Sequence, residues 1–151
     1  MRSTIKEIGA LLLAATILGF SYTFVVKRGF FVPSNPNTPL KNENVQMLSL
    51  SEAKNIFDAK SGLFIDARHS FEYRLGHIIG SINIPLNEFE SQKILLSQTP
   101  KDHLLVVYCD GAECNSSLEL ALKLTGIGFS NIKVFFGGWQ EWTSQHYPTE
   151  R

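Results

Sequence analysis

The chain has 151 residues, and its 14 basic and 14 acidic side chains cancel to a net charge of zero. Neither sign of charge gathers into a run, which excludes the basic surface typical of proteins that bind nucleic acid. Two cysteines are too few for a disulfide framework. Once the N-terminal region is set aside, the remaining residues are enough for one compact domain with an adequate core.

The N-terminal region carries an uncharged apolar run at 8–26, preceded by a short tail at 1–7. The run is long enough to cross the hydrocarbon core of a bilayer, so it predicts a transmembrane helix. A signal peptide is the alternative because Arg2 and Lys6 precede the run, but no small-residue cleavage site follows before Lys27. We therefore expect an uncleaved, single-pass anchor. Short tails ahead of a first span commonly stay inside, which places the following domain outside the cytoplasm, in a periplasm.

A linker follows the apolar run, at residues 27–44. Pro33, Pro36 and Pro39 each fix φ, remove a hydrogen-bond donor and discourage helix in the preceding residue. The segment therefore predicts a semi-extended spacer. The folded domain is expected to occupy residues 45–151.

Helical and strand patterns alternate along the domain. Ser49 and Glu52 have the spacing of a capping box, followed by apolar residues of a short helix. Short apolar runs typical of strands occur at Leu63–Ala67, Ser81–Pro85, Leu104–Tyr108 and Lys133–Phe136. Helical patterns lie between the later runs, within Leu86–Gln98 and at Ser116–Thr125. This alternation predicts a parallel α/β sheet covered by helices on both faces, with ligands bound beyond the carboxyl ends of the strands.

Cys109 stands at one such strand end, directly before a small polar loop and a helix. Unpaired backbone N–H groups and a positive helix dipole at this place favour an anion. Thiol pKa values in such settings fall from about 8.5 to roughly 3.5–7.5. The alternative is a cysteine packed as a small apolar side chain. The sequence favours a reactive Cys109, with Cys114 reacting more slowly.

Cys114 follows five positions later in the same loop. Two thiols this close can form a disulfide, resolve one another or bind a metal ion. The four histidines are scattered without the spacing of ligands, so we expect no metal site and no other cofactor. A disulfide needs Cα atoms within roughly 7 Å, which a curled loop satisfies and an extended loop does not.

Several segments together resemble the rhodanese-like family. An Asp-x-Arg strand end at 66–68 precedes a Gly-His-Ile-x-Gly turn at 76–80, as in that family's first signature. Val106–Cys109 resembles the strand that enters its active-site loop, and the segment from Gly128 to Trp142 resembles its closing part. The resemblance covers about residues 45–148. It implies one domain with a parallel five-stranded sheet flanked by helices, in which Cys109 carries sulfur as a persulfide.

The loop departs from the commoner pattern of that family, which has an Arg before a Ser or Thr at its end. Here either Asn115 or Cys114 takes the place of that Arg. Without a guanidinium, and with acidic side chains at Asp110 and Glu113, a doubly charged donor such as thiosulfate should bind weakly. A thiol, a disulfide or another protein's persulfide fits better. The residues expected to bind sulfur in the loop are Asp110, Gly111, Ala112, Glu113, Asn115 and Ser116.

Other motif residues are expected to support the site. Asp66 and Arg68 are interpreted as an ion pair that orders the surroundings of Cys109. His77 is expected to bond to backbone in its turn. Trp139 and Trp142, three positions apart, are interpreted as core residues of a short packed helix.

Three functions stay open at this point. The first is a membrane-anchored sulfurtransferase that moves sulfane sulfur through a Cys109 persulfide to a thiol acceptor, so its partners are a sulfur donor and a thiol. The second is a dithiol/disulfide redox protein in which Cys109 attacks and Cys114 resolves. The third is a binding module of the same fold without catalytic activity.

Overall fold

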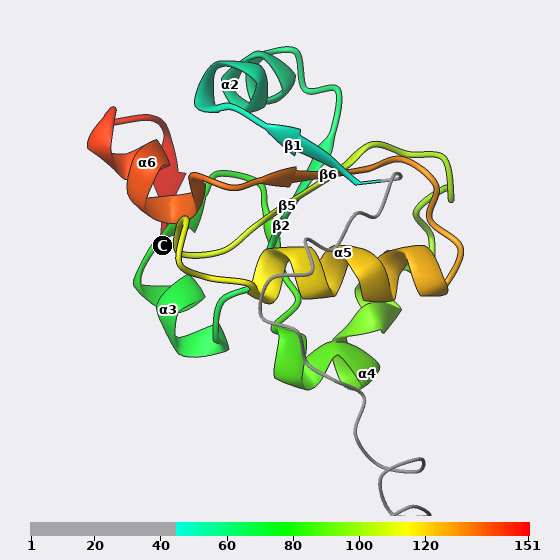
Figure 1. Cartoon of the computed structure of the whole chain (residues 1–151). Coiled ribbons are helices and arrows are strands. Elements are labelled where there is room, and N and C mark those ends of the chain that lie inside the picture. The colour runs from blue at the N-terminus through cyan, green and yellow to red at the C-terminus, as the bar shows by residue number, and fades with distance from the viewer. Residues whose placement is uncertain (1–44) are drawn as a thin grey trace, which may run out of the picture. The chain divides into compact units, whose positions relative to one another are not determined.

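The computed structural model describes residues 45–151, which form a sheet with helices on both faces (Figure 1). The sheet order is β1-β6-β5-β2-β4, and all neighbouring strands are parallel. The five strands are β1 (Gln46–Leu48), β2 (Leu63–Asp66), β4 (Ile82–Asn83), β5 (Leu105–Tyr108) and β6 (Ile132–Phe135). The predicted five-stranded parallel sheet is thereby confirmed.

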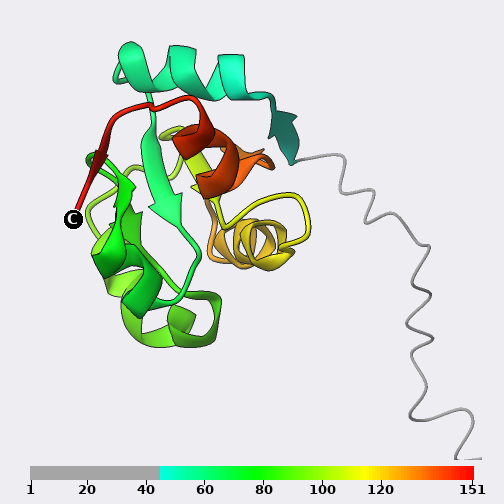
Figure 2. The ribbon, with the colours of Figure 1, turned by 90° about the vertical axis from the view of Figure 1, so that its left-hand side faces the viewer.

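Five α-helices surround this sheet within the described part of the chain, and two single-turn 3₁₀ helices flank α4. Helix α2 lies on one side of the sheet, whereas α4 and α5 lie on the other (Figures 1 and 2). A small antiparallel pair, β3 (His77–Ile78) with β7 (Thr149–Glu150), sits apart from the main sheet. The helices are α2 (Leu50–Asp58), α3 (Ser70–Leu75), α4 (Phe89–Gln92), α5 (Ser116–Gly126) and α6 (Gly138–Ser144).

The central strands are buried on both faces, and alternation along β5 decides which face each side chain joins. Val107 and Cys109 belong to the core under α5, whereas Val106 and Tyr108 belong to the core that includes Trp142 of α6. Successive strand residues point to opposite faces. Cys109, one residue beyond the strand, therefore points toward α5.

Most predicted elements are present, with small shifts at their ends. Ser49 caps α2, and its backbone N–H bonds to the Glu52 carboxylate at 2.8 Å, which completes the predicted capping box. The sequence analysis did not predict β1, α3, β3 or β7. These elements have six residues or fewer, so their hydrophobic patterns are too short to stand out.

The predictions for residues 1–44 lie outside the described residues. They comprise the tail at 1–7, the transmembrane helix at 8–26 and the linker at 27–44. Among residues 45–151, no helix combines the length and the apolar character needed to cross a bilayer.

The start of α6 holds the end of β5 by two backbone hydrogen bonds. The N–H of Trp139 donates to the carbonyl of Cys109 at 2.8 Å, and the N–H of Gln140 donates to the carbonyl of Asp110 at 2.9 Å. This approach requires Gly138, whose φ is +57° and whose position leaves no room for a Cβ beside the Cys109 carbonyl. We call this pair of hydrogen bonds the α6 clamp.

We expect Gly138→Ala to lower the free energy of unfolding by about 2–4 kcal/mol, because the new methyl group adds backbone strain and meets a backbone oxygen. Denaturant unfolding of the variant measures this change. Gly126→Ala is the control, since a Cβ at this last residue of α5 meets open space. Its expected effect is about 1 kcal/mol or less, toward greater stability. Equal stability of the two variants would contradict the role of the clamp.

Candidate active site

Cys109 lies at the carboxyl end of β5, with 1% of its surface exposed. Its Sγ donates to the carbonyl oxygen of Cys114 at 3.0 Å and lies 3.3 Å from the hydroxyl of Ser117 on α5. The thiol thus faces a backbone acceptor and one hydroxyl. In place of the several backbone N–H groups expected from the sequence, the N–H of Ser117 acts on the sulfur.

The pKa of Cys109 is raised to about 11 by burial and by its interaction with the Cys114 thiol, and the hydroxyl and backbone N–H of Ser117 only partly offset these effects. Burial disfavours the charged form of a thiol, and a carbonyl acceptor stabilises the neutral form. The prediction of a lowered pKa at Cys109 is therefore wrong. The sequence placed the residue correctly at a strand end but could not show how deeply the loop covers it.

Cys114 has the environment that was expected for Cys109. Burial opposes its ionisation, but its pKa is lowered by the Cys109 thiol, by the backbone N–H groups of Asp110 and Ser116 and by the Ser116 hydroxyl. Ser116 begins α5, so one of these donors belongs to the helix N-terminus. The thiolate of this loop therefore forms more readily on Cys114 than on Cys109.

The α6 clamp explains why a backbone donor reaches Cys114. The carbonyl of Cys109 and the N–H of Asp110 belong to one peptide unit and point in opposite directions. Since the carbonyl points to Trp139 at the start of α6, the N–H of Asp110 points into the loop. There it stabilises the Cys114 sulfur.

The loop between β5 and α5 is a tight turn, and hydrogen bonds to α6 hold its first residues. The N–H of Cys114 donates to the carbonyl of Gly111 at 2.9 Å. The carboxylate of Asp110 accepts from the Gln140 amide at 2.7 Å, which ties the loop again to α6. Of the remaining predicted loop residues, Ser116 is half-buried, whereas those at the tip or next to α5 are exposed: Ala112, Glu113 and Asn115.

Two hollows beside the loop include Cys114 in their walls, and Cys109 lines neither. One has a volume of about 390 Å³ and is formed by the loop itself together with Gln140. The other has about 290 Å³ and lies between the loop and the segment after β2. The polar or ionisable residues in the wall of this second hollow include Arg68, His69, Glu72, Asp110, Cys114 and Ser116. A small molecule in either hollow contacts Cys114.

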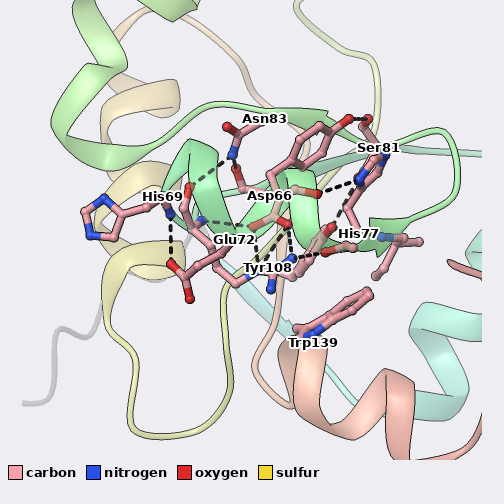
Figure 3. Close-up of polar contacts among 12 residues, drawn as sticks. Asp66, His69, Glu72, His77, Ser81, Asn83, Tyr108 and Trp139 are labelled. Atoms are coloured by element: carbon pink, nitrogen blue, oxygen red, sulfur yellow. Dashed lines mark hydrogen bonds and ion pairs between the residues drawn. The ribbon is translucent and has the colours of Figure 1, made fainter. Parts of the chain in front are cut away.

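Asp66 and Arg68 form a buried ion pair, as predicted (Figure 3). The guanidinium Nη2 lies 2.7 Å from the carboxylate and also donates to the carbonyl of Gly76 at 2.7 Å. The ring of Trp139 stacks on the guanidinium, with its centroid 4.6 Å from Cζ. This ion pair therefore fixes the segment from residue 66 to 76 against α6, and it forms one wall of the smaller hollow.

His77 has the structural role that its turn suggested. Its Nδ1 lies 2.9 Å from the carbonyl of Tyr73, and the two rings stack. Its Nε2 lies 3.4 Å from the carboxylate of Glu150 in β7. These contacts attach β7 to β3, and His77 lines neither hollow of the loop.

Three residues at the site went unrecognised or were assigned differently from sequence. Ser117 contacts the Cys109 sulfur and Gln140 bonds to Asp110. Trp139 is half-buried against Arg68, in contrast to its expected place in the core, whereas Trp142 is fully buried as predicted. A polar residue at the second position of the helix after the loop was the signal available for Ser117.

Among residues 45–151, no His, Cys, Asp and Glu side chains gather in a group that could hold a metal ion.

The fold and the loop define a class of α/β domain with a thiol at the carboxyl end of a central parallel strand and a second thiol beside it. A family model described as "Rhodanese-like domain" matches residues 49–145, more than half of the chain. The chain belongs to the rhodanese-like family.

Curated relatives and solved structures agree with this assignment. The chain is 28% identical over 112 residues to a tRNA uridine(34) hydroxylase of Buchnera aphidicola subsp. Baizongia pistaciae, covering 72% of this chain but only 33% of that relative. It is 29% identical over 108 residues to the uncharacterized protein YibN of Escherichia coli strain K12, covering 71% and 73% of the two chains.

Two solved structures illustrate the likeness of the fold. A rhodanese-related protein from Thermoplasma volcanium has a TM-score of 0.58 and 27% identity, covering 70% of this chain and 97% of that one. The human single-domain sulfurtransferase TSTD1 has a TM-score of 0.57 and 22% identity, covering 66% and 96%.

We expect Asp66→Asn to lower the free energy of unfolding by about 3–5 kcal/mol, because it leaves the Arg68 charge buried without its partner. Denaturant unfolding measures the loss. The control is Asp58→Asn, which breaks the exposed Lys54–Asp58 pair and should change stability by only about 0.5 kcal/mol. A loss at Asp66 no larger than that of the control would argue against a buried ion pair.

We expect iodoacetamide to alkylate Cys114 before Cys109 near neutral pH, because Cys114 is more accessible and ionises more readily. Cleavage of the chain between the two cysteines, followed by mass spectrometry of the fragments, measures the labelling rate of each thiol. In Cys114→Ser, labelling of Cys109 should still rise with pH above neutrality, because burial keeps its pKa raised after the Cys114 thiol is removed. In denaturant the two cysteines should label alike, which is the control. Faster labelling of Cys109 in the folded protein would contradict the structure.

Proposed function

We propose that this domain is a sulfurtransferase that takes sulfane sulfur from a donor, holds it as a persulfide on Cys109 and gives it to a thiol acceptor. One observation carries the proposal: a buried thiol follows the central strand of a rhodanese-like sheet and donates to the backbone carbonyl of a more accessible cysteine beside a hollow. A thiol in this setting can act as nucleophile and carrier in two successive transfers. The fold likeness to a protein named as a sulfurtransferase supports the proposal.

The charges of the loop favour a particular class of donor. The described loop contains no Arg or Lys between Cys109 and Ser116, and the Arg68 charge is neutralised by Asp66. Asp110 and Glu113 add negative charge. A doubly charged anion such as thiosulfate would find no bidentate partner here. We propose persulfides and polysulfides of thiols as donors.

A dithiol/disulfide redox function is the second candidate, because the two thiols interact. The Cys109 sulfur lies 3.0 Å from the backbone carbonyl of Cys114, and the two cysteines are free thiols in this structure. In this reading Cys114 attacks an external disulfide and Cys109 resolves it, the reverse of the order first expected. Sulfur transfer leaves a persulfide on the domain, whereas the redox cycle leaves an internal disulfide.

We also propose that the domain acts at a membrane surface, on the side away from the cytoplasm. The uncharged run at 8–26 supports this part of the proposal. A thiol acceptor would then be a small molecule or a protein that reaches that surface.

We expect the protein, incubated with cysteine persulfide, to gain one sulfur atom, carried mainly on Cys109 and released by an excess of thiol. Mass spectrometry after rapid alkylation locates the sulfur. The variant with both cysteines replaced by serine is the blank. A folded wild-type protein that gains no sulfur would refute the transferase. An internal disulfide formed in place of the persulfide would favour the redox candidate.

A further inference from the structure

The two thiols of the loop differ in their access to a donor molecule. The Cys109 side chain is 1% exposed and lines neither hollow beside the loop. Cys114 is half-buried and lines both. The smaller hollow, of about 290 Å³, is at the lower end of the size range for small-molecule sites. A donor that enters it contacts Cys114 and not Cys109.

The thiols also differ in the state in which they meet that donor. With a pKa of about 11, roughly one Cys109 in ten thousand is a thiolate at pH 7. The pKa of Cys114 is lowered, against the effect of burial, by the Cys109 thiol and by donors from Asp110 and Ser116. Since the thiolate is the attacking form, Cys114 is the better nucleophile at neutral pH.

We infer that Cys114 is the residue through which sulfane sulfur enters and leaves the loop, and that Cys109 is the buried store behind it. The inference rests on the proposed sulfurtransferase function and assigns the order of its steps. It reverses the order suggested by position in the sequence, where the strand-end cysteine attacks first.

The first step transfers sulfur from the donor to Cys114. The Cys114 thiolate attacks the outer sulfur of a persulfide R–S–SH, so a bond forms between Sγ and that sulfur. The donor's S–S bond breaks, and R–S⁻ leaves with the electron pair. The products are Cys114–S–SH and a thiolate that takes a proton from water. No net oxidation takes place, and no further reactant is needed.

The second step moves the sulfur inward. The Cys109 sulfur attacks the outer sulfur of Cys114–S–SH and gives up its proton. The Cys114 Sγ–S bond breaks and the proton passes to the departing Cys114 sulfur, which leaves Cys109–S–SH and the Cys114 thiol. The contact of the Cys109 sulfur with the Cys114 backbone, at 3.0 Å, places the two residues for this exchange. Release to an acceptor thiol follows the same two steps in reverse.

The environments of the two thiols give the second step its direction. In thiol exchange the thiol of lower pKa is the better leaving group, and the more basic thiol retains the sulfur. Cys114 loses the sulfur and is stabilised as a thiolate by backbone N–H groups. Cys109 keeps the sulfur in a buried place, away from water and from unrelated thiols.

The walls of the smaller hollow narrow the class of donor. The charge of Arg68 is neutralised by Asp66. The negative charge in the wall of the hollow therefore comes from the carboxylates of Glu72 and Asp110. These carboxylates disfavour donors with a net negative charge. A small persulfide that carries less negative charge than thiosulfate, such as cysteine persulfide, suits both the volume and the charge.

The test uses the full chain with cysteine persulfide as the donor, at pH 7, and follows sulfur on each cysteine by mass spectrometry. We expect Cys109→Ser still to accept sulfur on Cys114, where the sulfur stays because the storing thiol is absent. We expect Cys114→Ser to load Cys109 about ten- to a hundredfold more slowly than wild type. This slow rate should rise with pH above 7, because burial keeps the pKa of Cys109 raised in this variant and the thiolate is the attacking form.

The controls separate this inference from the proposed function. The variant lacking both thiols gives the background, and unfolding midpoints show that each single variant folds. If folded Cys114→Ser loads Cys109 at the wild-type rate, the inference is overturned while the transferase stands. If Cys109→Ser is folded and takes no sulfur, Cys114 is not the entry point. If the wild-type protein takes no sulfur, the transferase itself is refuted. Should Cys114→Ser not fold, Cys109→Ser alone decides.

Discussion

The α6 clamp is the constraint on which the site depends. Two N–H groups at the start of α6 hold the carbonyls of Cys109 and Asp110, and only glycine at position 138 allows the approach. The clamp fixes the orientation of the peptide unit between Cys109 and Asp110. Its N–H then stabilises the Cys114 sulfur, while Cys109 is left facing a carbonyl oxygen. This backbone contact thus adds to the causes that make Cys114 the more acidic thiol.

Desolvation and hydrogen bonding have opposite net effects on the pKa values of Cys109 and Cys114, two identical side chains five positions apart. Cys109 is sealed under α5, where the cost of burying a charge exceeds the help from Ser117. Cys114 is also partly buried, but donors outweigh that cost. The buried pair of Asp66 and Arg68 keeps a strong positive charge near the loop without offering it to a ligand. The loop is therefore suited to thiol chemistry more than to binding anions.

The sequence predicted the architecture well because the arrangement of strands and helices in this domain follows from local hydrophobic patterns. Apolar strand runs alternate with helical ones, and that alternation leads to a parallel sheet with the Cys109 loop at its carboxyl end. The sequence also indicated the ion pair of Asp66 and Arg68. It did not predict the pKa order of the thiols, because that order depends on a contact between residues 109 and 139. A sequence pattern within one segment does not indicate the orientation of a single peptide unit.

The same long-range contact has a consequence for the newly made chain. Helix α6 follows every strand of the main sheet in the sequence, and its Trp142 belongs to the core on one face of that sheet. A domain of this size folds as one unit. The Asp110 N–H is therefore turned toward Cys114 only once the chain has been made through α6 and the domain has folded. A nascent chain that ends before α6 lacks the contact that helps to make the two thiols different.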